Sequence, residues 1–112
     1  MNKFDSIVAG ALDIAQTEAL KHKNSQLSAA HLLWGLISNP QAFSSRAFKS
    51  HKKDVTKLLD SMPTVKEGIS VDRMHPDAKF SEWLTYASSH AIQAGRQEVS
   101  ERDLLRFLPQ VL

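Results

Sequence analysis

The 112-residue sequence contains no cysteine and only four glycines and four prolines. The lack of cysteine excludes disulfides, thiolate metal ligands and thiol nucleophiles, and it agrees with a reducing compartment. The N-terminal residues carry no uncharged apolar run of the kind found in signal peptides. No stretch approaches the ~18 apolar residues that a membrane span requires. We therefore expect a cytoplasmic protein without a membrane partner.

The excess of positive over negative charge is small as well. Fourteen Lys and Arg residues stand against twelve Asp and Glu residues, a net charge of +2 with the histidines neutral. So small an excess does not indicate a nucleic-acid partner. Hydrophobic residues make up 42% and charged residues 23% of the chain, which is the composition of a folded protein. Residues 1–112 are expected to form a single domain with its own core.

Motifs for catalysis and metal binding are missing too. The sequence has no glycine-rich phosphate loop, no G-x-S-x-G elbow and no believable acid–base pair, so we expect a non-catalytic domain without a cofactor. No two of the five histidines stand four residues apart on a helix, and none has the companions of a zinc site. His31, just inside an expected helix start, is predicted to be buried and hydrogen-bonded rather than a metal ligand.

Apolar residues recur at intervals of three and four along most of the chain, the spacing of one helix face. The pattern predicts an all-α fold with helices over about 4–23, 28–38, 41–49, 54–62, 77–95 and from 100 onward. No alternating strand pattern is present, and only 26–27 and 98–99 are expected to be extended.

The expected helix boundaries rest on capping residues and breakers. Pro63, Gly68 and Pro76 mark 63–76 as a linker between the two halves. Asp103 follows Ser100 by three residues, as the acidic partner of a capping box would. The residues in N-cap positions are Ser28, Asp54, Asp77 and Ser100.

The two pairs of a long and a short helix align without a gap at an offset of 72 residues. Residues 8–36 and 80–108 share seven identities, where composition alone gives about two, and this indicates an internal duplication. We predict two pseudo-repeated motifs in one compact bundle, with a first copy over about 4–62 and a partial second copy over 77–112. The identical pairs are Leu12/Leu84, Ala15/Ala87, Ala19/Ala91, Ser28/Ser100, Leu32/Leu104, Leu33/Leu105 and Leu36/Leu108.

Further aligned pairs extend the expected core. Phe80 and Trp83 lie on the face that Val8 and Ala11 occupy in the first copy, so both are expected to be buried. Ile92 aligns with Leu20 and is expected to continue the apolar face. Asp103 aligns with His31, which supports a capping role for both residues.

The repeated pattern resembles the N-terminal double Clp-repeat domain of the Clp/Hsp100 unfoldases. The resemblance covers nearly the whole chain and is carried by Leu12, Ala15, Ala19, Leu27, Ser28 and His31-Leu32-Leu33 in the first copy and by Phe80, Leu84, Ala87, Ala91, Gly95, Val99 and Leu104-Leu105 in the second. The sequence LLDSMPTV at 58–65 is similar to the ClpB-type disaggregases and the related ClpV of type VI secretion, while AGRQEVSE is similar to ClpA. The subfamily is therefore open.

The resemblance implies a protein-binding domain that captures unfolded or aggregated polypeptide, or an adaptor or partner helix, in an apolar groove. In such domains the groove lies near the start of the first helix and the turn into the sixth. Carried over to this sequence, it implies a site made of Phe4, Asp5, Arg96, Gln97, Glu98 and Arg102. Ala30 and Arg102 replace the glutamates with which ClpC-type domains bind phosphoarginine, which argues against that ligand.

The family domain has eight helices, and the second copy here stops before the last two. An end on Val111-Leu112 favours a fragment of a large ATPase over a stand-alone relative that docks on a Clp complex. In the first case the resemblance implies a homohexameric parent that binds ATP and Mg, while this domain alone is expected to be monomeric.

Two features remain open between a functional and a structural interpretation. Trp34 aligns with Arg106 and is a candidate exposed anchor for a partner, although packing beneath residues 41–50 is favoured. The basic cluster of Lys49, His51, Lys52, Lys53 and Lys57 is a candidate contact for phosphate, nucleic acid or an acidic partner, although a solvated surface turn is favoured.

Overall fold

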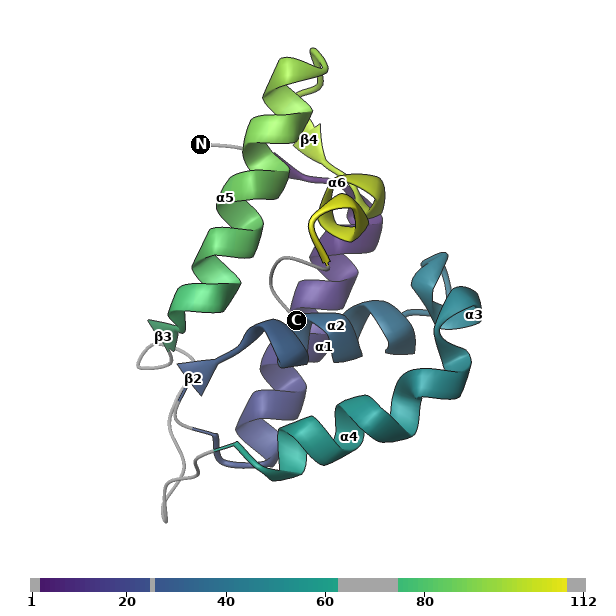
Figure 1. Cartoon of the computed structure of the whole chain (residues 1–112), viewed down its shortest axis with the longest axis vertical. Helices are drawn as coiled ribbons and strands as arrows, with labels where there is room; N and C mark the ends of the chain where they lie inside the picture. Colours follow the sequence, from purple (N-terminus) through teal and green to yellow (C-terminus); the bar gives the residue numbers. More distant parts are fainter. Residues whose placement is uncertain (1–2, 25, 63–74, 109–112) are drawn as a thin grey trace.

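The computed structural model describes residues 3–24, 26–62 and 75–108. Apart from four two-residue strands, the elements over these ranges are helical, so the all-α prediction is confirmed (Figure 1). The helices are α1 (Ser6–Lys21), α2 (Ala29–Ser38), α3 (Ser44–Ala47), the short 3₁₀ helix η1 (Lys49–His51), α4 (Lys52–Asp60), α5 (Ala78–Gln93) and α6 (Glu101–Arg106).

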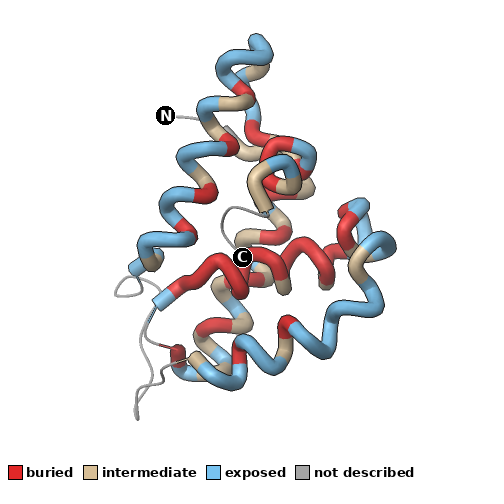
Figure 2. Tube along the Cα trace, in the orientation of Figure 1, coloured by how far each residue is buried: buried red, intermediate tan, exposed pale blue. Residues whose placement is uncertain are grey.

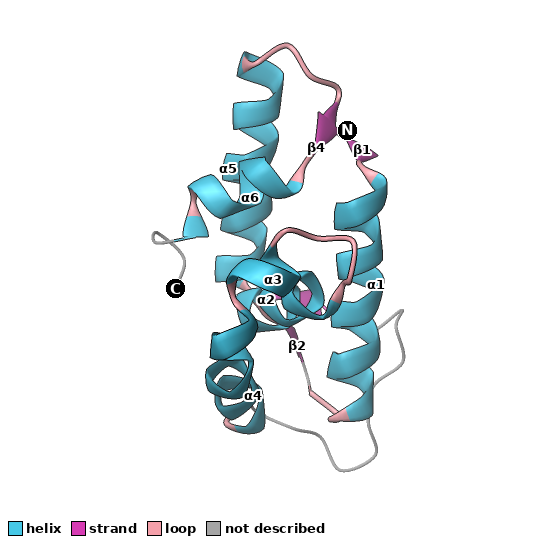
Figure 3. Cartoon of the chain, turned by 90° about the vertical axis from the view of Figure 1, so that its right-hand side faces the viewer, coloured by secondary structure: helices cyan, strands magenta, loops and turns pink. Residues whose placement is uncertain are grey.

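Helix α2 lies between the two long helices α1 and α5, which stand on either side of it (Figure 3). The side chains that meet there form one core, and they include the predicted Phe80 and Trp83, which are buried. Figure 2 shows the buried residues concentrated along α2 and on the inward faces of α1 and α5, with α4 mostly exposed. The small residues Ala15, Ala19, Ala87 and Ala91 are all buried.

The strands join the two copies reciprocally. Strand β1 (Lys3–Phe4) pairs in parallel with β4 (Glu98–Val99), and β2 (Gln26–Leu27) pairs in parallel with β3 (His75–Pro76). The offset of 72 carries β1 onto β3 and β2 onto β4, so each copy pairs its first strand with the other copy's second strand. The hydrogen bonds correspond too, because the amide of Asp5 donates to Val99 O at 3.0 Å and that of Asp77 to Leu27 O at 2.9 Å.

Three of the predicted caps are confirmed, Ser28, Asp77 and Ser100, and Asp5, which was predicted only as a site residue, caps α1. Asp5 and Asp77 each accept the backbone N–H three residues on, at 2.8 Å, and Ser28 and Ser100 both form capping boxes. The long helices end alike, because Lys23 and its counterpart Gly95 both have positive φ, 55° and 79°.

Three predictions of detail are wrong. Helix α4 begins at Lys52 with His51 in the capping position, so Asp54 lies in the first turn and is not the cap. The region 41–49 is not one helix, because α3 ends at Ala47 and η1 follows. Ile92 is 61% exposed and does not continue the core. The predicted linker lies outside the described residues except for His75 and Pro76, which form β3.

Candidate functional site

A hollow of about 400 Å³ lies where β1 meets β4, and its walls are Asp5, Arg96, Gln97, Glu98 and Ser100. Four of these residues belong to the site that the family resemblance implies. They come from opposite ends of the chain, because the pairing of β1 with β4 places the start of α1 beside the turn that leads into α6 (Figure 1). The fifth, Ser100, was predicted only as a helix cap.

The backbone fixes the rim of this hollow. Gly95 turns the chain out of α5 with a φ of 79°, in the left-handed region that glycine tolerates best. The Arg96 amide then donates to Ala91 O at 2.9 Å. One oxygen of the Asp5 carboxylate is already engaged, because Asp5 Oδ1 accepts a hydrogen bond from the Val8 amide at the start of α1. The exposed side chains of Gln97 and Glu98 are the groups of this rim that are available to a ligand.

Arg96 is held in place by a buried carboxylate behind the hollow. Asp103 has no exposed surface and accepts hydrogen bonds from both terminal nitrogens of Arg96, from His90 Nδ1 and from the amide and hydroxyl of Ser100. Burial alone raises the pKa of Asp103, but the hydrogen bonds from Arg96, Ser100 and His90 outweigh it and lower that pKa to about 2. Arg96 therefore forms a fixed part of the lining of the hollow, and 37% of its side chain is accessible to solvent.

The first copy builds the corresponding network from a histidine. His31 Nδ1 accepts the Ser28 amide at 2.9 Å, and its Nε2 lies 2.9 Å from Asn24 Oδ1, so Nε2 carries the proton of a neutral ring. Asn24 is the counterpart of Arg96 and His31 the counterpart of Asp103. The predicted buried, capping role of His31 is confirmed, and desolvation lowers its pKa to about 4.

A neutral, fully buried His31 makes stability depend on pH. Its pKa falls from 6.5 in the unfolded chain to about 4 in the fold, so the neutral form is the one that the fold favours. Its contribution is complete above pH 6.5 and is lost as the pH falls from 6.5 through 4, at a cost of about 3 kcal/mol. Urea unfolding at pH 7 and pH 4.5 measures this loss. A His31→Asn variant is the control, and an equal loss in that variant would assign the effect to other groups.

The remaining predicted residues lie elsewhere. Phe4 is half-buried against the core, Arg102 is exposed on α6, and neither lines the hollow. Trp34 is half-buried against the core with Lys52 Nζ 5.0 Å from its ring centroid, so it is neither a bare anchor nor fully covered. Reasoning from the sequence missed His90, whose distance of thirteen positions from Asp103 gave no local signal.

The described residues that line the hollow are polar or charged and offer amide, carboxylate and guanidinium groups for hydrogen bonding, whereas the exposed Ile92 at the end of α5 does not line it. Among the described residues no group of three or more His, Cys, Asp or Glu could hold a metal ion. No helix over the same ranges is long and apolar enough to cross a membrane.

Comparisons with known proteins identify the family of this chain. A family model described as the Clp repeat (R) N-terminal domain matches residues 3–108. The chaperone protein ClpB of Helicobacter hepaticus is 29% identical over 109 residues, which cover 85% of this chain and 12% of that protein. The chain thus spans about an eighth of the length of that relative.

Two solved structures share the fold. The Hsp104 N-terminal domain from Candida albicans matches with a TM-score of 0.78 and 21% identity, over 93% of this chain and 71% of that one. The N-terminal domain of the caseinolytic protease associated chaperone ClpD from Arabidopsis thaliana matches with a TM-score of 0.64 and 18% identity, over 91% and 72%. At these identities the likeness concerns the fold alone.

Proposed function

Because the chain belongs to the family of Clp repeat N-terminal domains, of the kind found in Clp/Hsp100 chaperones, we propose that it binds polypeptide at the hollow between β1 and β4. Its ligands are unfolded or aggregated chains, or a helix of an adaptor protein. The observation that carries the proposal is the hollow itself, in which Asp5, Arg96, Gln97 and Glu98 from opposite ends of the chain face one space.

The physical character of the hollow suits weak and unselective peptide binding. Gln97 both donates and accepts hydrogen bonds, as a peptide backbone does. A hollow of about 400 Å³ buries little surface, so the affinity should be low and release fast. Both are useful in a domain that passes its ligand on.

The names of the relatives suggest the wider role. ClpB is named a chaperone, and ClpD a protease-associated chaperone. We infer that this domain serves a cytoplasmic, hexameric, ATP-dependent unfoldase as its polypeptide-binding part, with ATP and Mg bound by other domains. Gene length tests this directly, because an open reading frame that continues into a Walker motif is expected, and one that ends after residue 112 would favour a stand-alone accessory protein.

Titration of the 112-residue chain with an unfolded model polypeptide tests the binding site. Amide shifts are expected at residues 4–5 and 96–100. Removing the side chains of Gln97 and Glu98 by a double substitution to alanine should weaken binding about tenfold, since it removes two exposed hydrogen-bonding groups worth about 1 kcal/mol each at most.

The matched control replaces the exposed residues Gln41 and Glu82, which lie outside the hollow, by alanine. This variant loses the same side-chain types and should bind as the native chain does. Shifts confined to other surfaces, or equal weakening in both variants, would rule out the hollow as the polypeptide site.

A further inference from the structure

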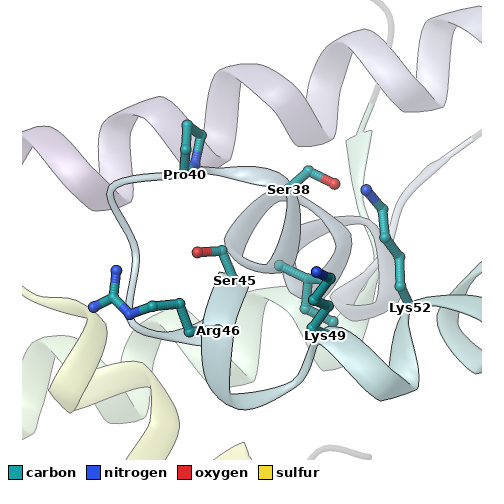
Figure 4. Close-up of a pocket in the computed structure, with 7 residues that line it drawn as sticks. Ser38, Pro40, Ser45, Arg46, Lys49 and Lys52 are labelled. Atoms are coloured by element: carbon teal, nitrogen blue, oxygen red, sulfur yellow. The ribbon is translucent and has the colours of Figure 1, made fainter.

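A second and larger pocket, of about 580 Å³, lies away from the hollow, where the end of α2 meets α3, η1 and the start of α4 (Figure 4). Its cationic side chains are Arg46, Lys49 and Lys52, and Ile37 and Pro40 supply apolar wall. The residues of the basic cluster are all exposed, as the interpretation as a solvated turn predicts, but Lys49 and Lys52 also line this pocket while Lys53 and Lys57 do not.

The three cations of this pocket lack acidic partners. Over the described residues, none of Arg46, Lys49 and Lys52 takes part in an ion pair. Two acids on neighbouring elements have other partners. Glu101 accepts the amides of Phe43 and Ser44 and the Ser44 hydroxyl, and the exposed Asp54 lies 3.5 Å from His51. Three like charges thus line one pocket without an acidic partner over the described residues, and Lys52 has instead the Trp34 ring, whose centroid lies 5.0 Å from its Nζ.

A buried hydroxyl adds a donor to the same cavity. Ser38 Oγ is inaccessible to solvent and has no hydrogen-bond partner within the described part of the chain. Figure 4 shows this hydroxyl and the Lys52 ammonium pointing toward one another from α2 and α4. A buried polar atom left without a partner costs free energy, which an acceptor oxygen would recover once the exposed Lys52 side chain moved aside and opened the hydroxyl to the pocket.

We propose that this pocket binds acidic segments of polypeptide, with at least two Asp or Glu carboxylates near Arg46, Lys49, Lys52 and the Ser38 hydroxyl. One carboxylate neutralises a single charge, whereas three cations require several. The apolar wall of Ile37 and Pro40 suits the methylene groups of such side chains. Among the described residues that line the pocket none is aromatic, and the nearby Trp34 ring already faces Lys52 Nζ at 5.0 Å, so the pocket lacks the free stacking platform that single-stranded nucleic acid uses.

The proposal rests on the proposed function in one respect, that the ligand is polypeptide. It adds a selection by charge, because chains with acidic clusters would contact both the hollow and this pocket, while neutral chains would use the hollow alone. Binding at the pocket depends on salt and binding at the hollow much less so.

The test uses the 112-residue chain and an unstructured peptide in which four glutamates alternate with alanines, titrated by calorimetry and NMR at low salt. Replacing Lys49 and Lys52 by glutamine should weaken binding about tenfold. The control K53Q/K57Q removes the same charge from exposed positions of α4 and should change the affinity less than about twofold. Equal losses in the two variants would overturn the pocket in favour of diffuse attraction.

A second variant separates binding from folding. Ser38→Ala removes a hydroxyl that has no partner in the protein, so thermal stability should hold or rise while peptide affinity falls about threefold. A fall in stability with unchanged affinity would make Ser38 structural and contradict its role. A single-stranded oligonucleotide of the same charge is titrated as well. If it binds more tightly than the acidic peptide, and if K49Q/K52Q loses that binding, the pocket is assigned to nucleic acid instead.

The proposals for the hollow and for the pocket can be refuted independently. Loss of the Gln97 and Glu98 side chains should leave binding of the acidic peptide at residues 38–52 intact, and K49Q/K52Q should leave binding of a neutral unfolded chain at the hollow intact. An acidic peptide that shifts only residues 96–100 would overturn the pocket while leaving the proposed function standing.

Discussion

Replacing Gly35 by alanine should destabilise the fold by about 3 kcal/mol, because α2 crosses α1 at this residue without room for a side chain. A Cβ at Gly35 would lie 2.1 Å from the carbonyl oxygen of Ala11 and 2.9 Å from its carbon. These atoms are helix backbone and cannot move aside as a flexible side chain would. The helices would have to separate, and the core along α2 would open.

Urea unfolding of Gly35→Ala measures this cost, and the sign of the change is informative. In an unobstructed helix interior, Gly→Ala stabilises by up to about 1 kcal/mol, so a gain would show that the crossing is looser than described. Gly95→Ala is the matched control. Its Cβ would meet nothing within 4 Å, and only its positive φ, 79°, opposes the change, at about 1 kcal/mol.

Replacing Asp103 by alanine should cost about 4 kcal/mol, since it removes a buried carboxylate and leaves its donors without an acceptor. Arg96, His90 and the Ser100 amide would lose their common partner. Because Arg96 and Ser100 line the hollow, polypeptide binding there should weaken as well. Unfolding and NMR titration of the same variant report the two losses.

Asp54→Ala is the control for this change. Asp54 is 71% exposed, and its one ion-pair partner over the described ranges is His51, at 3.5 Å, so its loss should lie within about 0.5 kcal/mol of zero. Comparable losses for Asp54 and Asp103 would contradict the role of the buried network. The low pKa of Asp103, about 2, also implies that native stability from this group persists above pH 3.8 and disappears only as the pH falls toward 2.

The sequence predicted the helices, the duplication and most caps, because these depend on residues three or four positions apart. Ser28 and His31 illustrate this, since both the cap and its partner lie within one turn. The repeat also predicted correctly that Asp103 does in the second copy what His31 does in the first. The family resemblance placed Asp5 with Arg96, Gln97 and Glu98, although neither spacing nor periodicity indicated it.

Contacts between distant elements had no local signal. Glu101 lies 57 positions from Ser44, and nothing in either neighbourhood predicts that its carboxylate holds the first amides of α3. Ile92 was misplaced because periodicity identifies a helix face but not the element that covers it. The basic cluster is exposed, as its interpretation as a solvated turn predicts, but a run of charges does not reveal that Lys49 and Lys52 also line a pocket.

The reciprocal strand pairing bears on the origin of the domain. A single copy would present two short strands without partners, and only a second copy could supply both, so its natural form would be a dimer with a two-fold axis. Joining the copies in one chain releases each from that symmetry. One copy can therefore hold a neutral histidine where the other holds a carboxylate that binds an arginine, and the two ends of the molecule need not be alike.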